Sequence, residues 1–186
     1  MSISKISVKI CNWMNHINQR SGEENQVIQY GLELLLDNLL KFLLIEIMGI
    51  LIGKGWQTLI VLFSFCGLRL QAGGKHAKTG IGCGLSMIAI WAISILGDSF
   101  YKINLIMLGY IYMICSGIVV SCVPRTINIE YFTLQEKRKK KLYSFLFLTV
   151  LLLVAAGIPE IRGLIVYPVV LEALTLLPKN KIEKGE

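Results

Sequence analysis

The sequence has few charged residues for its length. Asp, Glu, Lys and Arg make up 17% of its 186 residues, against roughly 25% in an ordinary soluble domain. Hydrophobic residues make up 54%, and the mean hydropathy is +0.63. This composition excludes a disordered chain and argues against a soluble globular domain, because long uncharged segments need lipid as their solvent. Any chemistry must therefore lie within or beside membrane helices.

Residues of the common catalytic and metal sites are also scarce. The five cysteines are an odd number and include no CxxC pair, which argues against a disulfide framework and a zinc site. The two histidines form no HExxH motif, the aspartates are Asp37 and Asp98, and no GxSxG sequence occurs. A zinc peptidase, an aspartic peptidase and a serine hydrolase are therefore poor candidates. We expect neither a cofactor nor a metal.

What the sequence does have is a series of six apolar segments. They cover residues 39–53, 55–68, 79–97, 103–124, 142–158 and 163–178. At roughly 20 residues per span, these are short to normal transmembrane helices. The sequence thus predicts an all-α integral membrane protein with about six transmembrane helices. We expect one membrane-embedded domain over residues 1–186, in which residues 28–178 form the helical bundle and 179–186 a cytoplasmic tail.

The first segment, residues 1–22, has a different pattern. Apolar residues recur at three- and four-residue steps, and polar residues such as Lys9 fall on the other side. This spacing predicts an amphipathic helix over residues 3–20. The helix is too polar to cross a bilayer and would lie at the membrane interface. Residues 21–24 end it, and we expect the next helix to start there.

The net charge of +7 is unevenly distributed among the predicted loops. A cytoplasmic N-terminus puts the basic clusters on the cytoplasmic side, as the positive-inside rule requires. These clusters are Lys5, Lys9 and Arg20; Arg69, Lys75 and Lys78; Arg125 and residues 137–141; and Lys179, Lys181 and Lys184. We therefore expect a multi-pass protein of the cell membrane with both termini cytoplasmic. Basic clusters of this kind contact anionic lipids, so the expected partner is the bilayer and not a nucleic acid.

The most informative segment is residues 69–83, on the predicted cytoplasmic side. It contains four glycines, Arg69, Lys75, His76, Lys78 and Cys83. On a straight helix His76 and Cys83 would stand about 10.5 Å apart along the axis, whereas proton transfer needs roughly 3 Å. The glycines permit a bent backbone that brings the imidazole to the thiol.

Such a bend would create a reactive cysteine. His76 would take the thiol proton of Cys83, and the three nearby cations would favour the thiolate, which is the nucleophilic form. The alternative is a cytoplasmic loop with an ordinary histidine and an inert cysteine. Spacing alone leaves both interpretations open.

In this segment, Arg69, Gly73, Gly74, His76-Ala77 and Cys83 match the R-x-x-x-G-G-x-H-A-x-x-x-x-x-C signature of the accessory gene regulator B family. The chain also resembles this family in its amphipathic start, its six-span pattern, the Tyr30-Gly31-Leu32-Glu33 stretch, and Val123-Pro124 before a basic cluster. Members of the family are membrane-embedded cysteine endopeptidases of Gram-positive quorum sensing.

The resemblance implies a role for each matching residue. Cys83 would be the nucleophile and His76 its base, at the cytoplasmic side, with Arg69, the glycine pair, Lys75 and Lys78 in support. The substrate and partner would be a short, AgrD-like pheromone precursor. Cleavage at the C-terminal side of the pheromone segment would pass through an acyl-thioester and lead to a thiolactone or lactone ring. A homodimer is compatible with this function.

The remaining charges in apolar segments permit several interpretations. Glu172 lies within the sixth segment, where a charge indicates function or a buried partner; it would contact substrate, be neutral, or pair with Lys41. Glu33, Asp37 and Lys41 are spaced four apart, which indicates a solvated stripe with an i,i+4 ion pair or a substrate contact. Two other function classes use these features: a small transporter or scaffold in which Glu172 and Asp37 line a polar path, and a subunit that docks a cytoplasmic protein.

Overall fold

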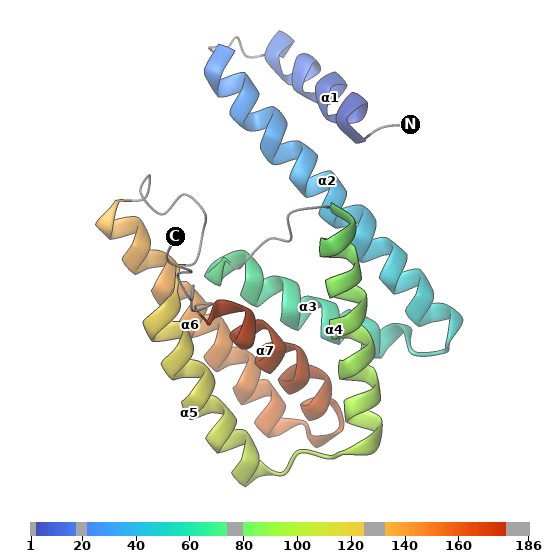
Figure 1. The fold of residues 1–186 in the computed structure, drawn as a ribbon, viewed down its shortest axis with the longest axis vertical. Helices are drawn as coiled ribbons and strands as arrows, with labels where there is room; N and C mark the ends of the chain where they lie inside the picture. Colours follow the sequence, from blue (N-terminus) through green and yellow to red (C-terminus); the bar gives the residue numbers. More distant parts are fainter. Residues whose placement is uncertain (1–2, 18–21, 74–79, 125–132, 178–186) are drawn as a thin grey trace, which may run out of the picture. The chain divides into compact units, whose positions relative to one another are not determined.

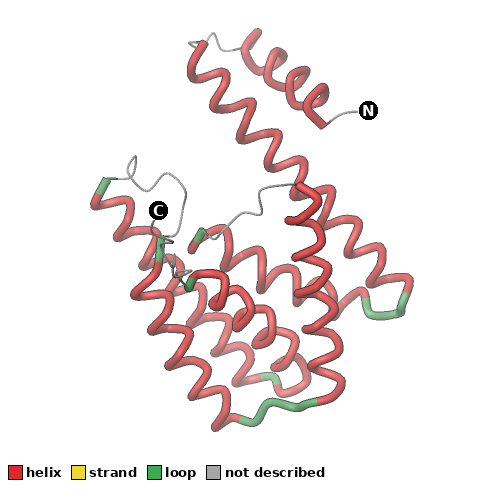
Figure 2. Tube along the Cα trace, in the orientation of Figure 1, coloured by secondary structure: helices red, strands yellow, loops and turns green. Residues whose placement is uncertain are grey.

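The computed structural model describes residues 3–17, 22–73, 80–124 and 133–177. Within these ranges the chain is helical and has no strand, and short loops join most of the helices (Figures 1 and 2). The helices are α1 (Ile3–Ile17), α2 (Gly22–Leu51), α3 (Gly55–Ala72), α4 (Gly80–Phe100), α5 (Leu105–Cys122), α6 (Leu134–Gly157), the 3₁₀ turn η2 (Pro159–Ile161) and α7 (Arg162–Leu176). The all-α class expected from the sequence is thus confirmed.

Three of the described helices are long and apolar enough to cross a membrane. They are α4 over Gly82–Phe100, α5 over Leu105–Cys122 and α6 over Leu134–Gly157. Helix α7 has 15 residues, which makes it about 22 Å long, whereas the hydrocarbon core of a bilayer is about 30 Å thick. The three helices are consistent with a membrane protein, and the count of six spans stays a prediction.

Helix α6 begins earlier than the apolar pattern predicts. The sequence placed this helix at residues 142–158, with the basic run 137–141 in the preceding cytoplasmic segment, but the helix starts at Leu134. A capping box explains the early start: Thr133 N donates to Glu136 Oε2 at 2.8 Å, and Glu136 N donates to Thr133 Oγ1 at 3.3 Å. The two bonds satisfy backbone groups that a helix start leaves without partners.

The chain divides into two compact units, residues 1–48 and 49–186. In the first unit, a hydrogen bond from Cys11 Sγ to Asn25 Oδ1, 3.0 Å long, joins α1 to the start of α2. Ser7 and Cys11 are buried, whereas Trp13 is exposed. A helix over most of residues 3–20 is therefore confirmed, and its position at a membrane interface stays a prediction.

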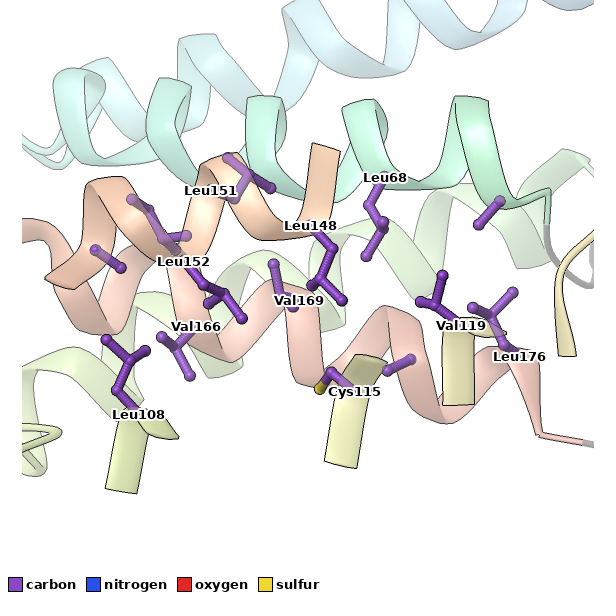
Figure 3. Close-up of a cluster of buried hydrophobic side chains, with 14 of the residues drawn as sticks. Leu68, Leu108, Cys115, Val119, Leu148, Leu151, Leu152, Val166, Val169 and Leu176 are labelled. Atoms are coloured by element: carbon purple, nitrogen blue, oxygen red, sulfur yellow. The ribbon is translucent and has the colours of Figure 1, made fainter. Parts of the chain in front are cut away.

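Helix α7 is the central element of the second unit. It contacts α3, α4, α5 and α6, and nine of its residues are buried. The main core cluster draws side chains from α3, α5, α6 and α7, including Leu68, Leu108, Cys115, Val119, Leu148, Val169 and Leu176 (Figure 3). Because lipid tails are as apolar as these side chains, close packing rather than escape from water holds membrane helices together.

Polar contacts hold the start of α7 in place. The Arg162 guanidinium donates to the backbone oxygens of Ala155, Ala156 and Ile103 at 2.9, 3.2 and 3.1 Å. The first two oxygens lie in the last turn of α6, where carbonyls have no helical partner and the helix dipole favours a cation. Tyr167 Oη also donates to the Tyr101 carbonyl at 3.1 Å. These bonds position α7, which carries Glu172.

Candidate active site

A small cavity of about 80 Å³ lies beside Cys83. Its wall consists of Phe65 and Arg69 of α3, Cys83, Ser86, Met87 and Ile90 of α4, and Thr175 of α7. Because a water needs roughly 10–15 Å³ of such space, the cavity has room for several waters or for a small group such as a carbonyl and its neighbours. Cys83 and Arg69 thus line the same cavity.

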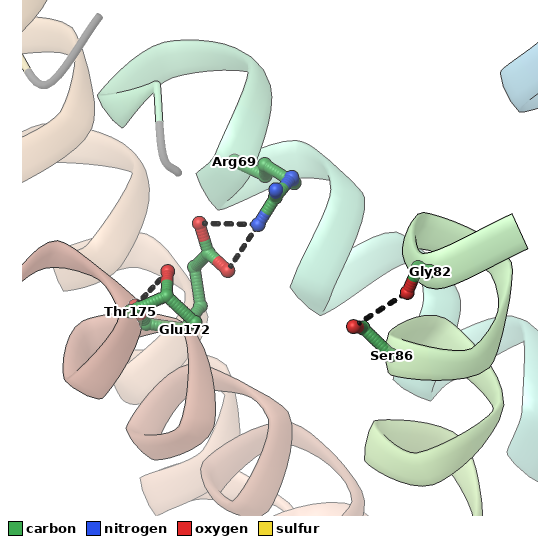
Figure 4. Close-up of polar contacts among 5 residues, drawn as sticks. All are labelled: Arg69, Gly82, Ser86, Glu172 and Thr175. Carbon is green, nitrogen blue, oxygen red and sulfur yellow. Dashed lines mark hydrogen bonds and ion pairs between the residues drawn. The ribbon is translucent and has the colours of Figure 1, made fainter. Parts of the chain in front are cut away.

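Figure 4 shows the charged pair that Arg69, a residue of the cavity wall, forms with Glu172. Arg69 Nη1 lies 3.0 Å from Glu172 Oε2 and 3.4 Å from Glu172 Oε1. The Glu172 side chain is fully buried, and the Arg69 side chain is 19% exposed. A buried charge without its counter-charge is strongly destabilising, so each residue needs the other. The Arg69 guanidinium carbon also lies 5.5 Å from the centre of the Phe65 ring, within the range of a cation–π contact.

Cys83 lies in the first turn of α4, which begins at Gly80. Its side chain is partly exposed and carries a free thiol. The first turn of a helix is its positive end. One turn later, Ser86 Oγ donates to the Gly82 carbonyl at 2.8 Å (Figure 4). The start of α4 thus places a partly exposed thiol at the cavity.

The structure explains why one position of the motif is a glycine. Gly73 ends α3 with φ +75° and ψ −161°, and its N–H donates to the Arg69 carbonyl at 2.9 Å. A residue with a Cβ rarely adopts this backbone conformation. Gly73 therefore stops the helix four residues after Arg69, just before the predicted histidine segment.

The other residues of the motif are Gly74, Lys75, His76 and Lys78, and they lie outside the described residues. The contact between His76 and Cys83, and the supporting roles of the two lysines, therefore stay predictions from the sequence. Within the described part of the segment, Arg69 and Cys83 line one cavity.

The acidic residues have partners that the sequence indicated only in part. Glu172 pairs with Arg69, a partner that the sequence did not indicate. Lys41 pairs with Asp37, as their spacing of four predicted. Glu33 is partly buried on α2, in the first unit. Substrate contact by Glu33, Asp37 or Glu172 stays a prediction.

Sequence reasoning did not identify Phe65 or Thr175 as parts of the site. Phe65 precedes Arg69 by four residues, and side chains at this spacing meet on a helix, so the contact could have been anticipated. Thr175 follows Glu172 by three residues and donates to its backbone oxygen at 2.9 Å. The pairing of Arg69 with Glu172 joins positions 103 residues apart, and no local pattern indicates it.

Cys83 is the cysteine that lines the cavity. Cys115 is buried in the core cluster, and Cys66 is close enough to Arg69, Glu172 and Cys83 to interact electrostatically with them. Among the described residues, no group of three or more His, Cys, Asp and Glu side chains could hold a metal.

A second hollow of about 270 Å³ lies between α5 and α6. It is lined by apolar Val120, Leu142 and Phe145 and by the cations Arg138 and Lys141. Apolar walls with two cations at one site suit a ligand that is itself both apolar and anionic.

Comparison with known proteins places these features in a family. The profile of the family described as accessory gene regulator B matches residues 3–176. Accessory gene regulator protein B of Staphylococcus haemolyticus is 26% identical over 152 residues, which is 81% of each chain. Protein FsrB of Enterococcus faecalis is 30% identical over 179 residues, or 92% of this chain and 73% of that protein.

A putative AgrB-like protein of Clostridium perfringens is 28% identical over 170 residues, covering 87% of this chain and 75% of that protein. No solved structure matches the chain. The family match extends over nearly all of the chain, and it includes the helices that form the cavity around Cys83. The protein therefore belongs to the accessory gene regulator B family, which takes part in accessory gene regulation and quorum sensing.

Proposed function

We propose that this protein is a membrane-embedded cysteine endopeptidase that cleaves the C-terminal part of a short, AgrD-like pheromone precursor. The observation that carries the proposal is the small cavity that Cys83 shares with Arg69 at the start of α4. A nucleophilic thiol beside a cation, in a space that fits a carbonyl group, is the arrangement that acyl transfer needs. Membership of the accessory gene regulator B family supports the proposal independently.

The reaction has two acyl transfers. In the first, Cys83 Sγ bonds to the carbonyl carbon of the scissile peptide as its proton passes to His76. The C–N bond then breaks, the leaving amine takes the proton from His76, and the pheromone segment stays on Cys83 as a thioester. In the second, a side-chain thiol or hydroxyl of the precursor loses its proton to His76 and attacks the thioester carbonyl. The ring closes, and Cys83 leaves and regains a proton.

Ring closure at this stage makes energetic sense. A thioester and a thiolactone are close in free energy, so acyl transfer from one sulfur to another keeps the activation that hydrolysis would lose.

The proposal includes the membrane arrangement. Helices α4, α5 and α6 would span the bilayer with three less apolar helical segments, giving six spans, while α1 lies at the interface. The distribution of basic residues supports cytoplasmic termini and a cytoplasmic Cys83. The hollow with Arg138 and Lys141 would hold an anionic lipid, with acyl chains along its apolar wall.

Substitution of the nucleophile tests the proposal. In cells that co-express a tagged precursor, Cys83→Ala should abolish cleavage, because no other group can form the acyl-enzyme. Cys83→Ser should be nearly inactive, since a hydroxyl is a far weaker nucleophile than a thiolate. The readout is the mobility shift of the precursor, and Cys122→Ala, on α5 and away from the cavity wall, is the matched control. Cleavage by Cys83→Ala would refute the peptidase function.

A transporter or scaffold has less support. A transporter would use the carboxylates of Glu172 and Asp37 to line a polar path. Both carboxylates are instead paired with cations. Persistence of precursor cleavage without Cys83 would make this second function the better one.

A further inference from the structure

We propose that Glu172 is a positioning residue that holds the Arg69 guanidinium at the cavity, where it donates hydrogen bonds to the scissile carbonyl oxygen as Cys83 attacks. This inference rests on the proposed peptidase function. It extends that function by assigning the donor that stabilises the developing oxyanion and the residue that orients this donor.

The first step of the argument is the position of Arg69. Among the described side chains that line the cavity, Arg69 is the one cation and Cys83 the one thiol. In the proposed complex, a carbonyl group in this space has its carbon beside the Cys83 thiol and its oxygen beside Arg69. Negative charge that develops on this oxygen is stabilised by a nearby cation. Arg69 is thus suited to stabilise the tetrahedral intermediate.

The second step is the way in which Arg69 is held. An arginine side chain is long and flexible, and a catalytic donor must be held in one geometry to be effective. Arg69 Nη1 contacts both carboxylate oxygens of Glu172. The Phe65 ring lies 5.5 Å from the guanidinium carbon. The carboxylate and the ring together restrict the plane and the direction of the guanidinium.

The third step is the position of Glu172 itself. Its side chain is fully buried, and it does not line the cavity. It therefore acts through Arg69 and not on the substrate. Helix α7, which carries it, is held by the Arg162 and Tyr167 hydrogen bonds at its other end. Stability alone does not require such a pair, because well-packed apolar residues often replace a buried ion pair without loss.

The test compares four variants in proteoliposomes with a tagged precursor as substrate. Glu172→Gln keeps the shape of the side chain and removes its charge, and Glu172→Asp keeps the charge on a shorter side chain. The double variant Arg69→Met with Glu172→Leu replaces the pair by apolar residues of similar volume. The matched control is Asp98→Asn, which removes a largely buried carboxylate, 15% exposed, from α4. Asp98 lies about 22 Å from Cys83 along the helix axis.

We expect a loss in kcat with little change in KM. Glu172→Gln should lower kcat by roughly tenfold to a hundredfold, the usual cost of a misplaced catalytic group, and Glu172→Asp should recover part of the loss. The double variant should lose on the order of 10²–10³-fold, as when an oxyanion donor is removed. Asp98→Asn should match the wild type.

A second measurement separates positioning from misfolding. Alkylation of Cys83 by iodoacetamide, followed by mass spectrometry of the Cys83 peptide, needs an accessible thiolate but no oxyanion donor. It should not be slowed in Glu172→Gln, because the charge of Arg69 remains beside the thiol. If Glu172→Gln fails to fold, the double variant decides, since it leaves no unpaired charge.

Three outcomes would overturn the inference. They are a wild-type kcat in Glu172→Gln, a wild-type kcat in the double variant, and an equal loss in Asp98→Asn. Each of these leaves the peptidase function intact as long as Cys83→Ala is inactive. Cleavage by Cys83→Ala would instead refute the proposed function itself, so the two failures are distinguishable.

Discussion

Arg69 or Glu172 alone would destabilise an apolar helical bundle, whereas the bundle tolerates the two as an ion pair. Removal of one partner from such a buried pair typically costs about 3–5 kcal/mol, because the other charge stays buried without compensation. The sequence alone drew attention to both residues, since charges are rare in apolar segments. It could not pair them, because the contact depends on how α3 and α7 pack and joins positions 103 residues apart.

The backbone conformation of Gly73 leads to a testable prediction. Gly73→Ala should destabilise the protein by about 1–3 kcal/mol, the usual strain of a residue forced into such a conformation, because φ is +75° there. It should also lower precursor cleavage, since the end of α3 carries Arg69. The measurement is the apparent melting temperature in detergent together with cleavage.

Gly109→Ala is the control for this change. It lies within α5, and a Cβ there meets no atom within 4 Å. Because alanine is the better helix former, Gly109→Ala should be neutral or stabilising. A Gly73→Ala variant that is as stable and active as this control would show that the turn after α3 does not need glycine.

At the scale of single helices, the hydrophobic pattern located the apolar helices better than it located the helix ends. The early start of α6 shows the reason. A run of lysines and arginines is unfavourable inside a bilayer but compatible with a helix outside it, so the apolar pattern reports only the membrane part. The capping box of Thr133 and Glu136 is itself visible in the sequence, and attention to it would have placed the start correctly.

The close packing of α4 against α7 predicts that a methyl group added at Gly163 destabilises the protein. A Cβ on Gly163 would lie 2.2 Å from Asp98 Oδ1 and 3.1 Å from Asp98 Cβ. Gly163→Ala should therefore force the two helices apart and cost about 1–3 kcal/mol, as other overpacked contacts do. The apparent melting temperature in detergent measures this loss. Gly157→Ala, where a Cβ meets nothing within 4 Å, should not show it, and equal stability of the two variants would contradict the tight contact.

At the scale of the whole molecule, composition predicted the helical class and not the arrangement of the helices. A helix that faces lipid and a helix that faces other helices are both apolar, so the pattern could not identify α7 as the central element. Its short length and its interior Pro168 are instead features of a helix poorly suited to crossing a membrane. Its contacts with α3, α4, α5 and α6 show why it is apolar on all sides.

The topology prediction concerns the whole chain. Reporter fusions near Arg138 and at the C-terminus should read as cytoplasmic, and fusions near Lys102 and Glu160 as external. The physical reason is the excess of lysine and arginine in the loops assigned to the cytoplasm. An external signal near Arg138 would contradict the predicted topology, because it would place Cys83 on the side of the membrane opposite a cytoplasmic precursor.

The central position of α7 has a consequence for biosynthesis. Chains emerge from the ribosome with the N-terminus first, and α7 follows α3, α4, α5 and α6 in the sequence. Arg69 therefore meets the Glu172 carboxylate only after all of these helices have been made. The cavity wall also lacks Thr175 until that moment. A nascent or prematurely terminated chain would carry Cys83 without a completed site, so proteolytic activity would arise only once α7 has been inserted into the bundle.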